Sequence, residues 1–305
     1  MRCLIKYLFP VVCLANFKSS SAQIQITLRQ SFIDSFKNRV TISVDYVIDK
    51  AHAHPNPGSK GGDMHIAGRA ESVGLPIVAE IMNAKGEGSA VNKVHSAEGS
   101  DEIVQVTGAW RLWCEHAGED LQIQGEPLTQ FNTTNPAHVF EIHPITHLAG
   151  FNLLPSLKPI AGFTYKKAED ALMRYSATRC QIIPDNASNT VTIQTNGVGF
   201  NYVDCKIEIL QDPVVTDDGR FIFCKILSTD GEVIAQKVRV AFVKDSGPEK
   251  KAKLLGTGKQ MHVIAIPRID LALVSFRAKH ADDPQFPNIL SWNLPFELIA
   301  VAVLQ

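Results

Sequence analysis

Hydrophobic and polar residues alternate along most of this chain, which is the pattern of β-strands with one buried face. Val40, Ile42 and Val44 alternate with Thr41 and Ser43. Side chains two residues apart share one face of a strand, so this stretch has an apolar and a polar side. Further strand-like segments follow at 63–69, 75–82, 103–115 and 138–146, and helical spacing appears at 30–38 and more weakly at 86–99.

These elements predict a mainly β protein. Five strands with one helical insertion suit a small, partly open β-barrel of OB-like type, which we assign to residues 23–150. Residues 151–180 are expected to form a linker and a short helix. Strand-like segments, including one at 271–276, then recur to the end of the chain, and 247–253 reads as an exposed charged turn. We therefore expect residues 181–305 to form a β-sandwich-like domain.

Residues 1–22 have the features of a signal peptide. Arg2 and Lys6 precede an apolar run at 7–17, and the small residues at 20–22 suit a signal peptidase. The run is shorter than the roughly 20 apolar residues that a transmembrane helix needs. The sequence therefore predicts a secreted or periplasmic protein without a membrane span.

The charge of the mature chain argues against nucleic-acid binding. Of the 30 basic residues, Arg2, Lys6 and Lys18 lie in the signal segment, which leaves 27 against 31 acidic residues. Nucleic-acid binding depends largely on neutralising phosphates with basic side chains. Although Trp110, Arg111 and Trp113 are close together on one strand-like segment, no basic stripe accompanies them. We expect an unidentified small molecule or envelope component as ligand instead.

Four cysteines follow the signal segment: Cys114, Cys180, Cys205 and Cys224. In an oxidising compartment an even number of cysteines favours disulfides. Because Cys205 and Cys224 lie in consecutive strand-like segments, we expect them to pair, which leaves Cys114 with Cys180. The alternative is four buried free thiols, since no Cys-x-x-Cys spacing indicates zinc or redox chemistry.

The strongest functional signal is a pair of acid-x-His sequences. Asp63 and His65 are two residues apart in one strand-like segment, and Glu141 and His143 in another. If the strands are neighbours, two carboxylates and two imidazoles meet on one face, with facing Cβ atoms about 5 Å apart. Such groups bind divalent ions, with zinc or manganese as candidates. The alternative is a structural hydrogen-bond network, although burying several ionisable groups is costly.

Two further residues are candidates for catalysis. Glu80 interrupts the apolar segment around Ile77, and a buried glutamate normally has a partner, so it could be a general base. Glu115 and His116 are adjacent, so only one of them faces the site, and we favour His116. By the same alternation His147 extends the row of Glu141 and His143, whereas His138 lies on the opposite face.

The chain also resembles a group of uncharacterised bacterial proteins, often exported, that contain a short β-rich domain. The resemblance covers roughly residues 40–147 and rests on four segments in order: Gly62-Asp-Met-His65, Ile77-Val-Ala-Glu80, Val106-Thr-Gly108 and Phe140-Glu-Ile-His-Pro144. Gly61-Gly62 replaces the Asp-Gly typical of the group, which affects the turn more than the ligands. The resemblance implies that the acids and histidines act as a set, and it implies no activity.

Two functions fit these observations. In the first, the protein is a metal-dependent hydrolase acting on phosphate esters: His65 and His143 hold the ion with Asp63 or Glu141, and Glu80 orients or deprotonates water. In the second, it is a non-catalytic envelope or extracellular binding module whose acid–histidine pairs are structural. A nucleic-acid-binding barrel is a weaker third reading.

Overall fold

Two five-stranded β-barrels make up most of the molecule, which we describe from a computed structural model covering residues 23–118 and 121–304. The first barrel contains β2 (Thr41–Ala51), β3 (Met64–Arg69), β4 (Ile77–Ile81), β5 (Ile103–Leu112) and β7 (Phe140–Leu148). Neighbouring strands run antiparallel except β4 and β7, which are parallel. The strand order is β4-β3-β2-β5-β7, and the ring closes because β7 also pairs with β4. Helix α2 (Gly88–Ala97) lies between β4 and β5 in the chain.

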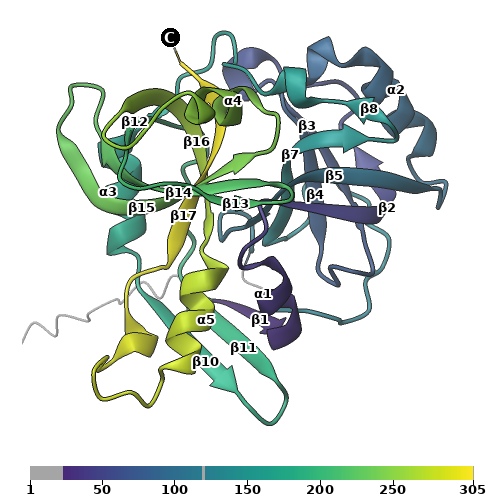
Figure 1. Ribbon diagram of the computed structural model, residues 1–305. Coiled ribbons are helices and arrows are strands. Elements are labelled where there is room, and N and C mark those ends of the chain that lie inside the picture. The colour runs from purple at the N-terminus through teal and green to yellow at the C-terminus, as the bar shows by residue number, and fades with distance from the viewer. Residues whose placement is uncertain (1–22, 119–120, 305) are drawn as a thin grey trace, which may run out of the picture.

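The second barrel repeats this arrangement. It contains β12 (Val203–Ile209), β14 (Gly219–Leu227), β15 (Val233–Val243), β16 (Gln260–Ile269) and β17 (Phe296–Val303). Its third and fifth strands are again the parallel pair, and helix α4 (Gly247–Lys253) again lies between the third and fourth strands. Figure 1 shows the two barrels side by side, one in purple to teal and one in green to yellow.

The mainly β class and the barrel are confirmed, with one difference in the second half. A sandwich was expected there, but β12 hydrogen-bonds to both β14 and β16, so the strands close into a barrel. The first barrel is likewise closed rather than partly open. Alternation along single strands cannot separate these architectures, because both bury one face of every strand.

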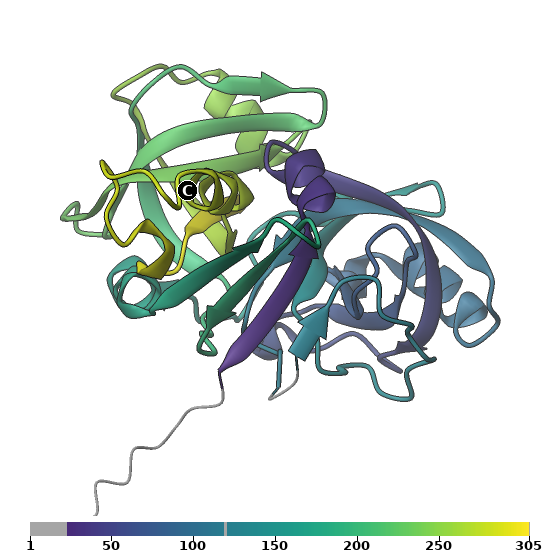
Figure 2. The ribbon, with the colours of Figure 1, turned by 90° about the horizontal axis from the view of Figure 1, so that it is seen from below.

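A third sheet joins segments that are far apart in the sequence. Its order is β10 (Cys180–Asp185), β11 (Thr190–Thr195), β1 (Ile24–Arg29) and β6 (Leu121–Ile123). Figure 2 shows β1 in purple beside the teal β11, with which it pairs along its whole length. The segment before the first barrel is therefore held by a hairpin that follows that barrel.

Smaller elements complete the fold. The helices are α1 (Gln30–Phe36), α3 (Ala168–Ala177) and α5 (Leu271–Lys279), and the short strands are β8 (Phe151–Asn152), β9 (Lys166–Lys167) and β13 (Val214–Thr216). Single 3₁₀ turns lie at Gly58–Lys60, Ala84–Gly86, Leu154–Ser156 and Ile289–Ser291. None of the helices in the described parts of the chain has the length and apolar composition that crossing a membrane requires.

Two predicted local structures are wrong. The segment 271–276 is helical instead of extended, because the Asp270 side chain accepts hydrogen bonds from the backbone of Ala272 and Leu273 and begins α5. The expected turn at 247–253 is α4, which begins at Ser246 with a hydrogen bond from the Glu249 backbone to the serine side chain. In both places a capping residue determined the structure.

The four cysteines are free thiols, so the expected disulfides are corrected. All four are buried. Burial raises the pKa of Cys180 and of Cys224 to about 12, so these thiols stay protonated. The alternative of buried, unreactive thiols describes this structure.

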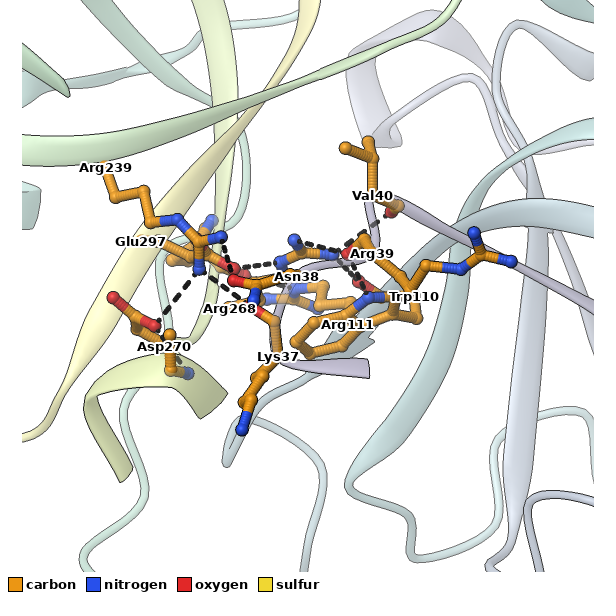
Figure 3. Close-up of polar contacts among 12 residues, drawn as sticks. Lys37, Asn38, Arg39, Val40, Trp110, Arg111, Arg239, Arg268, Asp270 and Glu297 are labelled. Carbon is orange, nitrogen blue, oxygen red and sulfur yellow. Dashed lines mark hydrogen bonds and ion pairs between the residues drawn. The ribbon is translucent and has the colours of Figure 1, made fainter. Parts of the chain in front are cut away.

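Buried charges fix the two barrels against each other (Figure 3). Arg268 donates to Glu297 at 2.7 Å and to the backbone oxygen of Trp110 at 3.0 Å, and its guanidinium carbon lies 3.6 Å from the Trp110 ring centroid. Arg239 is 3.2 Å from the other oxygen of Glu297 and donates to the backbone of Lys37 at 2.9 Å. These contacts join strands of the second barrel to the first barrel and to the segment that leads into it.

Candidate metal centre

The pairing of β3, β4 and β7 brings the acids and histidines together on the outer face of the first barrel. His65 on β3 lies directly opposite Glu80 on β4. The parallel pairing of β4 with β7 places Ala79 beside Ile142, so Glu80 and His143, one residue further along each strand, are also neighbours. Because Ala79 and Ile142 face the hydrophobic core, the adjacent side chains face outward. We call Asp63, His65, Glu80, Glu141 and His143 the acid–histidine row.

One end of the row forms a group that we call the outer trio, Asp63, His65 and Glu80. His65 Nε2 lies 3.7 Å from Asp63 Oδ1 and 3.7 Å from Glu80 Oε1. The Asn56 amide donates to Asp63 Oδ1 at 2.7 Å and orients that carboxylate. The side chain of His65 is 19% exposed and that of Asp63 is 7% exposed, so this end of the row reaches solvent.

The other end forms the inner trio, Glu80, Glu141 and His143. His143 Nδ1 lies 3.2 Å from Glu80 Oε2 and 3.4 Å from Glu141 Oε2. All three side chains are buried. In each trio one nitrogen or oxygen atom per residue lies within 4.8 Å of the others, so each group could hold a metal ion. Glu80 belongs to both trios, which makes it the central residue of the row.

Arg111 distinguishes the two trios. Arg111 is on β5, directly opposite Glu141 on β7. It donates to Glu141 Oε2 at 2.5 Å and to Glu115 Oε2 at 3.1 Å. Its Nε donates to the backbone oxygen of Pro267 in the second barrel at 2.9 Å. Since a fixed guanidinium already neutralises Glu141 and would repel a cation, the outer trio is the better metal site.

The second half of the chain closes the inner end of the row. The Tyr202 hydroxyl lies 2.7 Å from His143 Nε2. Tyr202 is buried, and burial raises the pKa of its hydroxyl well above the ordinary value, so it stays protonated. It donates to His143 Nε2 when the imidazole is neutral and accepts from Nε2–H when the imidazole is protonated, and in both cases the Nδ1–H faces the carboxylates.

Electrostatics leave the row short of fixed positive charge. Burial raises the pKa of Glu80, whereas Glu141, although burial opposes it, is held well below its usual pKa by Arg111. Burial also disfavours the charged form of His65, but the carboxylates of Glu80 and Asp63 outweigh it and raise the pKa to about 9. Three carboxylates thus face one guanidinium, and either a divalent cation or two protonated imidazoles would balance the remaining charge.

Two neighbouring histidines lie beside the row and not in it. His138 was expected on the opposite face, but its Nε2 lies 3.5 Å from Glu141 Oε1, because residue 138 precedes β7 and does not follow its alternation. His138 Nδ1 donates to the Pro136 backbone oxygen at 2.7 Å. His116 stacks on His138 with 5.2 Å between ring centroids and lies outside both trios.

His147 does not extend the row. Irregular pairing between β5 and β7 changes the alternation before this residue is reached, and its side chain is exposed. It lines a separate cavity of about 680 Å³ together with residues of the second barrel. His52, by contrast, stacks on His65 of the outer trio with 4.6 Å between ring centroids.

Sequence reasoning did not assign the residues that hold the row in place: Asn56, Arg111, His138 and Tyr202. For Arg111 a signal existed, since a basic residue lies between Trp110 and Leu112 in an apolar strand and a buried arginine needs an acidic partner. Tyr202 had no such signal, because its contact depends on how the second half packs against the first.

Comparison with protein-family models and with curated proteins finds no match to this chain. One solved structure with some similarity is titled "Structural mimicry for functional antagonism". The two chains are 11% identical, the alignment covers 78% of this chain and 90% of the other, and the TM-score is 0.18. At this TM-score the similarity supports neither a shared fold nor a shared function.

Proposed function

We propose that this protein binds a divalent metal ion through Asp63, His65 and Glu80. The observation that carries the proposal is that His65 Nε2 lies 3.7 Å from an oxygen of each carboxylate. This distance is too long for a hydrogen bond, but the three atoms are close enough to bind one ion. Neither Asp63 nor Glu80 lies within ion-pair distance of a lysine or arginine among the described residues. A bound cation would offset the cost of burying these carboxylates, which is several kcal/mol per ion.

Mixed nitrogen and oxygen ligands suit zinc or manganese. Three protein ligands would leave further coordination positions for water, and a bound ion of this kind lowers the pKa of water toward neutrality. The partial exposure of His65 supports access to this end of the row. We therefore propose metal-dependent hydrolysis, with phosphate esters as the first substrates to test. In this proposal Glu80 also receives or orients a proton at its Oε2, beside His143 Nδ1.

The proposed catalytic role of His116 is indirect. It reaches the row only through His138, on which it stacks, and through Glu115, whose Oε2 lies 4.0 Å from His116 Nε2. Burial lowers the pKa of His116, which leaves it neutral and able to accept a proton near neutral pH. We propose that it acts as a proton acceptor at the edge of the site.

A second candidate function is a non-catalytic binding module, as the inner trio suggests. Glu141 is neutralised by Arg111, and His143 is hydrogen-bonded by Tyr202. The Tyr202 contact joins the first barrel to the second half of the chain, and Arg111 does so through the Pro267 backbone oxygen, as expected of a structural network. In this case the outer trio would bind an ion for stability alone. Both proposals include export to the periplasm or to the outside of the cell. The signal peptide expected at residues 1–22 lies outside the described residues.

Elemental analysis of the purified protein, followed by zinc and manganese titrations of chelator-treated protein, tests the metal site. We expect one ion per chain, and about a hundredfold weaker binding after His65→Ala or Glu80→Gln. His147→Ala is the matched control, because this exposed histidine on β7 is outside the row. Equal ion binding by all four proteins, or none by the unmodified protein, would contradict the proposal.

Turnover of p-nitrophenyl phosphate and its bis-ester by metal-loaded protein separates the two functions. A hydrolase should lose turnover in Glu80→Gln and keep it in His147→Ala. A His116→Gln variant that is slower near neutral pH, approaches the rate of the unmodified protein at low pH and is unchanged in metal content would support a proton-accepting role. Stoichiometric metal without any turnover would favour the binding module.

A further inference from the structure

A pocket at the α5 end of the molecule combines two arginines with an exposed indole. Arg179, Arg277, Trp292 and Asn293 line a cavity of about 320 Å³. Arg277 lies in α5, Arg179 precedes β10, and the other two precede β17. Figure 1 places α5 beside β10 at the end of the molecule that also carries β11. None of these residues belongs to the acid–histidine row.

Backbone pairing makes the walls of this pocket rigid. The backbone nitrogen of Cys180 donates to the Trp292 oxygen, and that of Leu294 donates to the Thr178 oxygen, each at 2.8 Å. Arg179 and Asn293 between them form a β-bridge. The side chains of Arg179 and Trp292 therefore project from a fixed backbone, which reduces the conformational entropy lost when a ligand binds.

Arg277 forms the base of the pocket and lacks a counter-ion. It is only 5% exposed, and no carboxylate of the described residues lies within ion-pair distance of it or of Arg179. One of its N–H groups donates to the Asn293 backbone oxygen at 2.8 Å, and its buried Nε has no hydrogen-bond partner among residues 23–118 and 121–304. A guanidinium has five N–H donors, so most of its hydrogen-bonding capacity is unused.

The remaining wall suits a flat ring. Trp292 is 42% exposed, and the Arg277 guanidinium carbon lies 5.6 Å from its ring centroid.

The second guanidinium lies at the rim of the pocket, where Arg179 donates to the Asn293 side chain at 3.3 Å. Two guanidiniums match the charge of a phosphate monoester, close to −2 at neutral pH, and bind its oxygens in a forked geometry.

We propose that this pocket binds a phosphate monoester carried on a planar ring. The phosphate lies between Arg277 and Arg179, and the ring packs on Trp292. The cavity has the size of a small-ligand site, at the lower end of the usual range of about 300–1,000 Å³. The site is independent of the proposed metal centre, because the two share no residue.

Calorimetric titration of the whole protein with phenyl phosphate tests the proposal. Inorganic phosphate, benzoate and phenol serve as comparison ligands. We expect phenyl phosphate to bind with a dissociation constant of about 1 mM or lower. Inorganic phosphate should bind about tenfold more weakly because it lacks the ring, and phenol should not bind. Since Trp110 and Trp113 are buried, a ligand-induced change in tryptophan emission that Trp292→Phe abolishes would place the ring on Trp292.

Variants locate the phosphate. Arg277→Lys keeps the charge but loses the fork and should bind at least about tenfold more weakly, and Arg179→Gln should bind about fivefold more weakly. Arg174→Gln, an exposed arginine of α3 that does not line the pocket, is the matched control and should bind as the unmodified protein does. If Arg277→Lys fails to fold, the exposed Arg179 decides the outcome. Absence of phenyl phosphate binding, equal affinity for benzoate, or full affinity in Arg179→Gln would overturn the proposal.

Discussion

At the scale of single residues, Glu80 determines what the acid–histidine row can do. Its two oxygens face different partners, Oε1 toward His65 and Oε2 toward His143. Burial raises the pKa of this carboxyl while both imidazoles favour its charged form. The negative charge of Glu80 can therefore be balanced either by a proton on Glu80, His65 or His143 or by a metal ion beside them. Metal binding and proton binding should compete at this position.

This competition predicts a specific pH dependence for His65. Its pKa rises from 6.5 to about 9 on folding, so the folded protein binds this proton more tightly than the unfolded chain does. The contribution to stability is complete below pH 6.5 and is lost as pH rises to about 9. It amounts to about 3 kcal/mol. Urea unfolding of chelator-treated protein across this range should show the loss, and His65→Gln should lack it.

Metal binding should follow the opposite trend. Because the ion needs a neutral imidazole, its affinity should rise across the same pH range by up to about tenfold per unit. An affinity independent of pH would show that His65 is not a ligand, whatever the stability profile.

The buried thiols give a second prediction at this scale. A thiol reagent in denaturant should detect all four of Cys114, Cys180, Cys205 and Cys224, and very little in the folded protein. Reducing agent should leave the melting temperature unchanged. Two fewer reactive thiols in the unfolded protein would indicate that one of the expected disulfides forms after all.

At the scale of secondary-structure elements, Arg268 on β16 links β17 of the second barrel to β5 of the first. Arg268 donates to Glu297 on β17 and covers the ring of Trp110 on β5 (Figure 3). Both charged side chains are completely buried. A charge left without its partner in such a place is strongly destabilising, even where the pair itself adds little stability.

Arg268→Ala should therefore lower the free energy of unfolding by about 3–5 kcal/mol. Arg39→Ala, which removes a half-exposed arginine 3.8 Å from the exposed Asp217, should cost less than about 1 kcal/mol. Chemical denaturation of both variants measures the difference. Similar losses in the two would mean that the buried pair does not hold the barrels together.

The elements also show what sequence patterns could and could not predict. Alternation identified the five strands of the first barrel and placed Asp63, His65 and Glu141 on usable faces, because one face of each strand packs on the core. The apolar run that begins α5 fits a strand as well as a buried helix turn, so only the cap at Asp270 could separate them. The sandwich was indistinguishable from a barrel for a similar reason, since closure depends on pairing between distant strands.

At the scale of the whole molecule, the row is completed only when the two halves meet. Tyr202 reaches His143 across a separation of 59 residues, and Arg111 reaches Pro267 across 156. No local pattern encodes such contacts, which explains why Tyr202 was missed, whereas the basic residue in an apolar strand could have marked Arg111 but not its partner in the second barrel. The geometry of the site should therefore depend on the packing of the second half.

A double-mutant cycle on His143 and Tyr202 tests this dependence. Tyr202→Phe and His143→Gln should each destabilise the protein, and the double variant should cost less than their sum, with a coupling of about 0.5–3 kcal/mol. Additive losses in urea unfolding would show that the 2.7 Å contact contributes no coupling.

The position of β1 has a consequence for biosynthesis. This strand emerges from the ribosome first among the described elements, yet its main partner ends at Thr195, and Ile24 pairs with that residue. During translation the strand therefore has no complete β11 to pair with until the chain has been made as far as Thr195. An exported chain would benefit from this delay, because translocation through a membrane channel requires a polypeptide that has not yet folded.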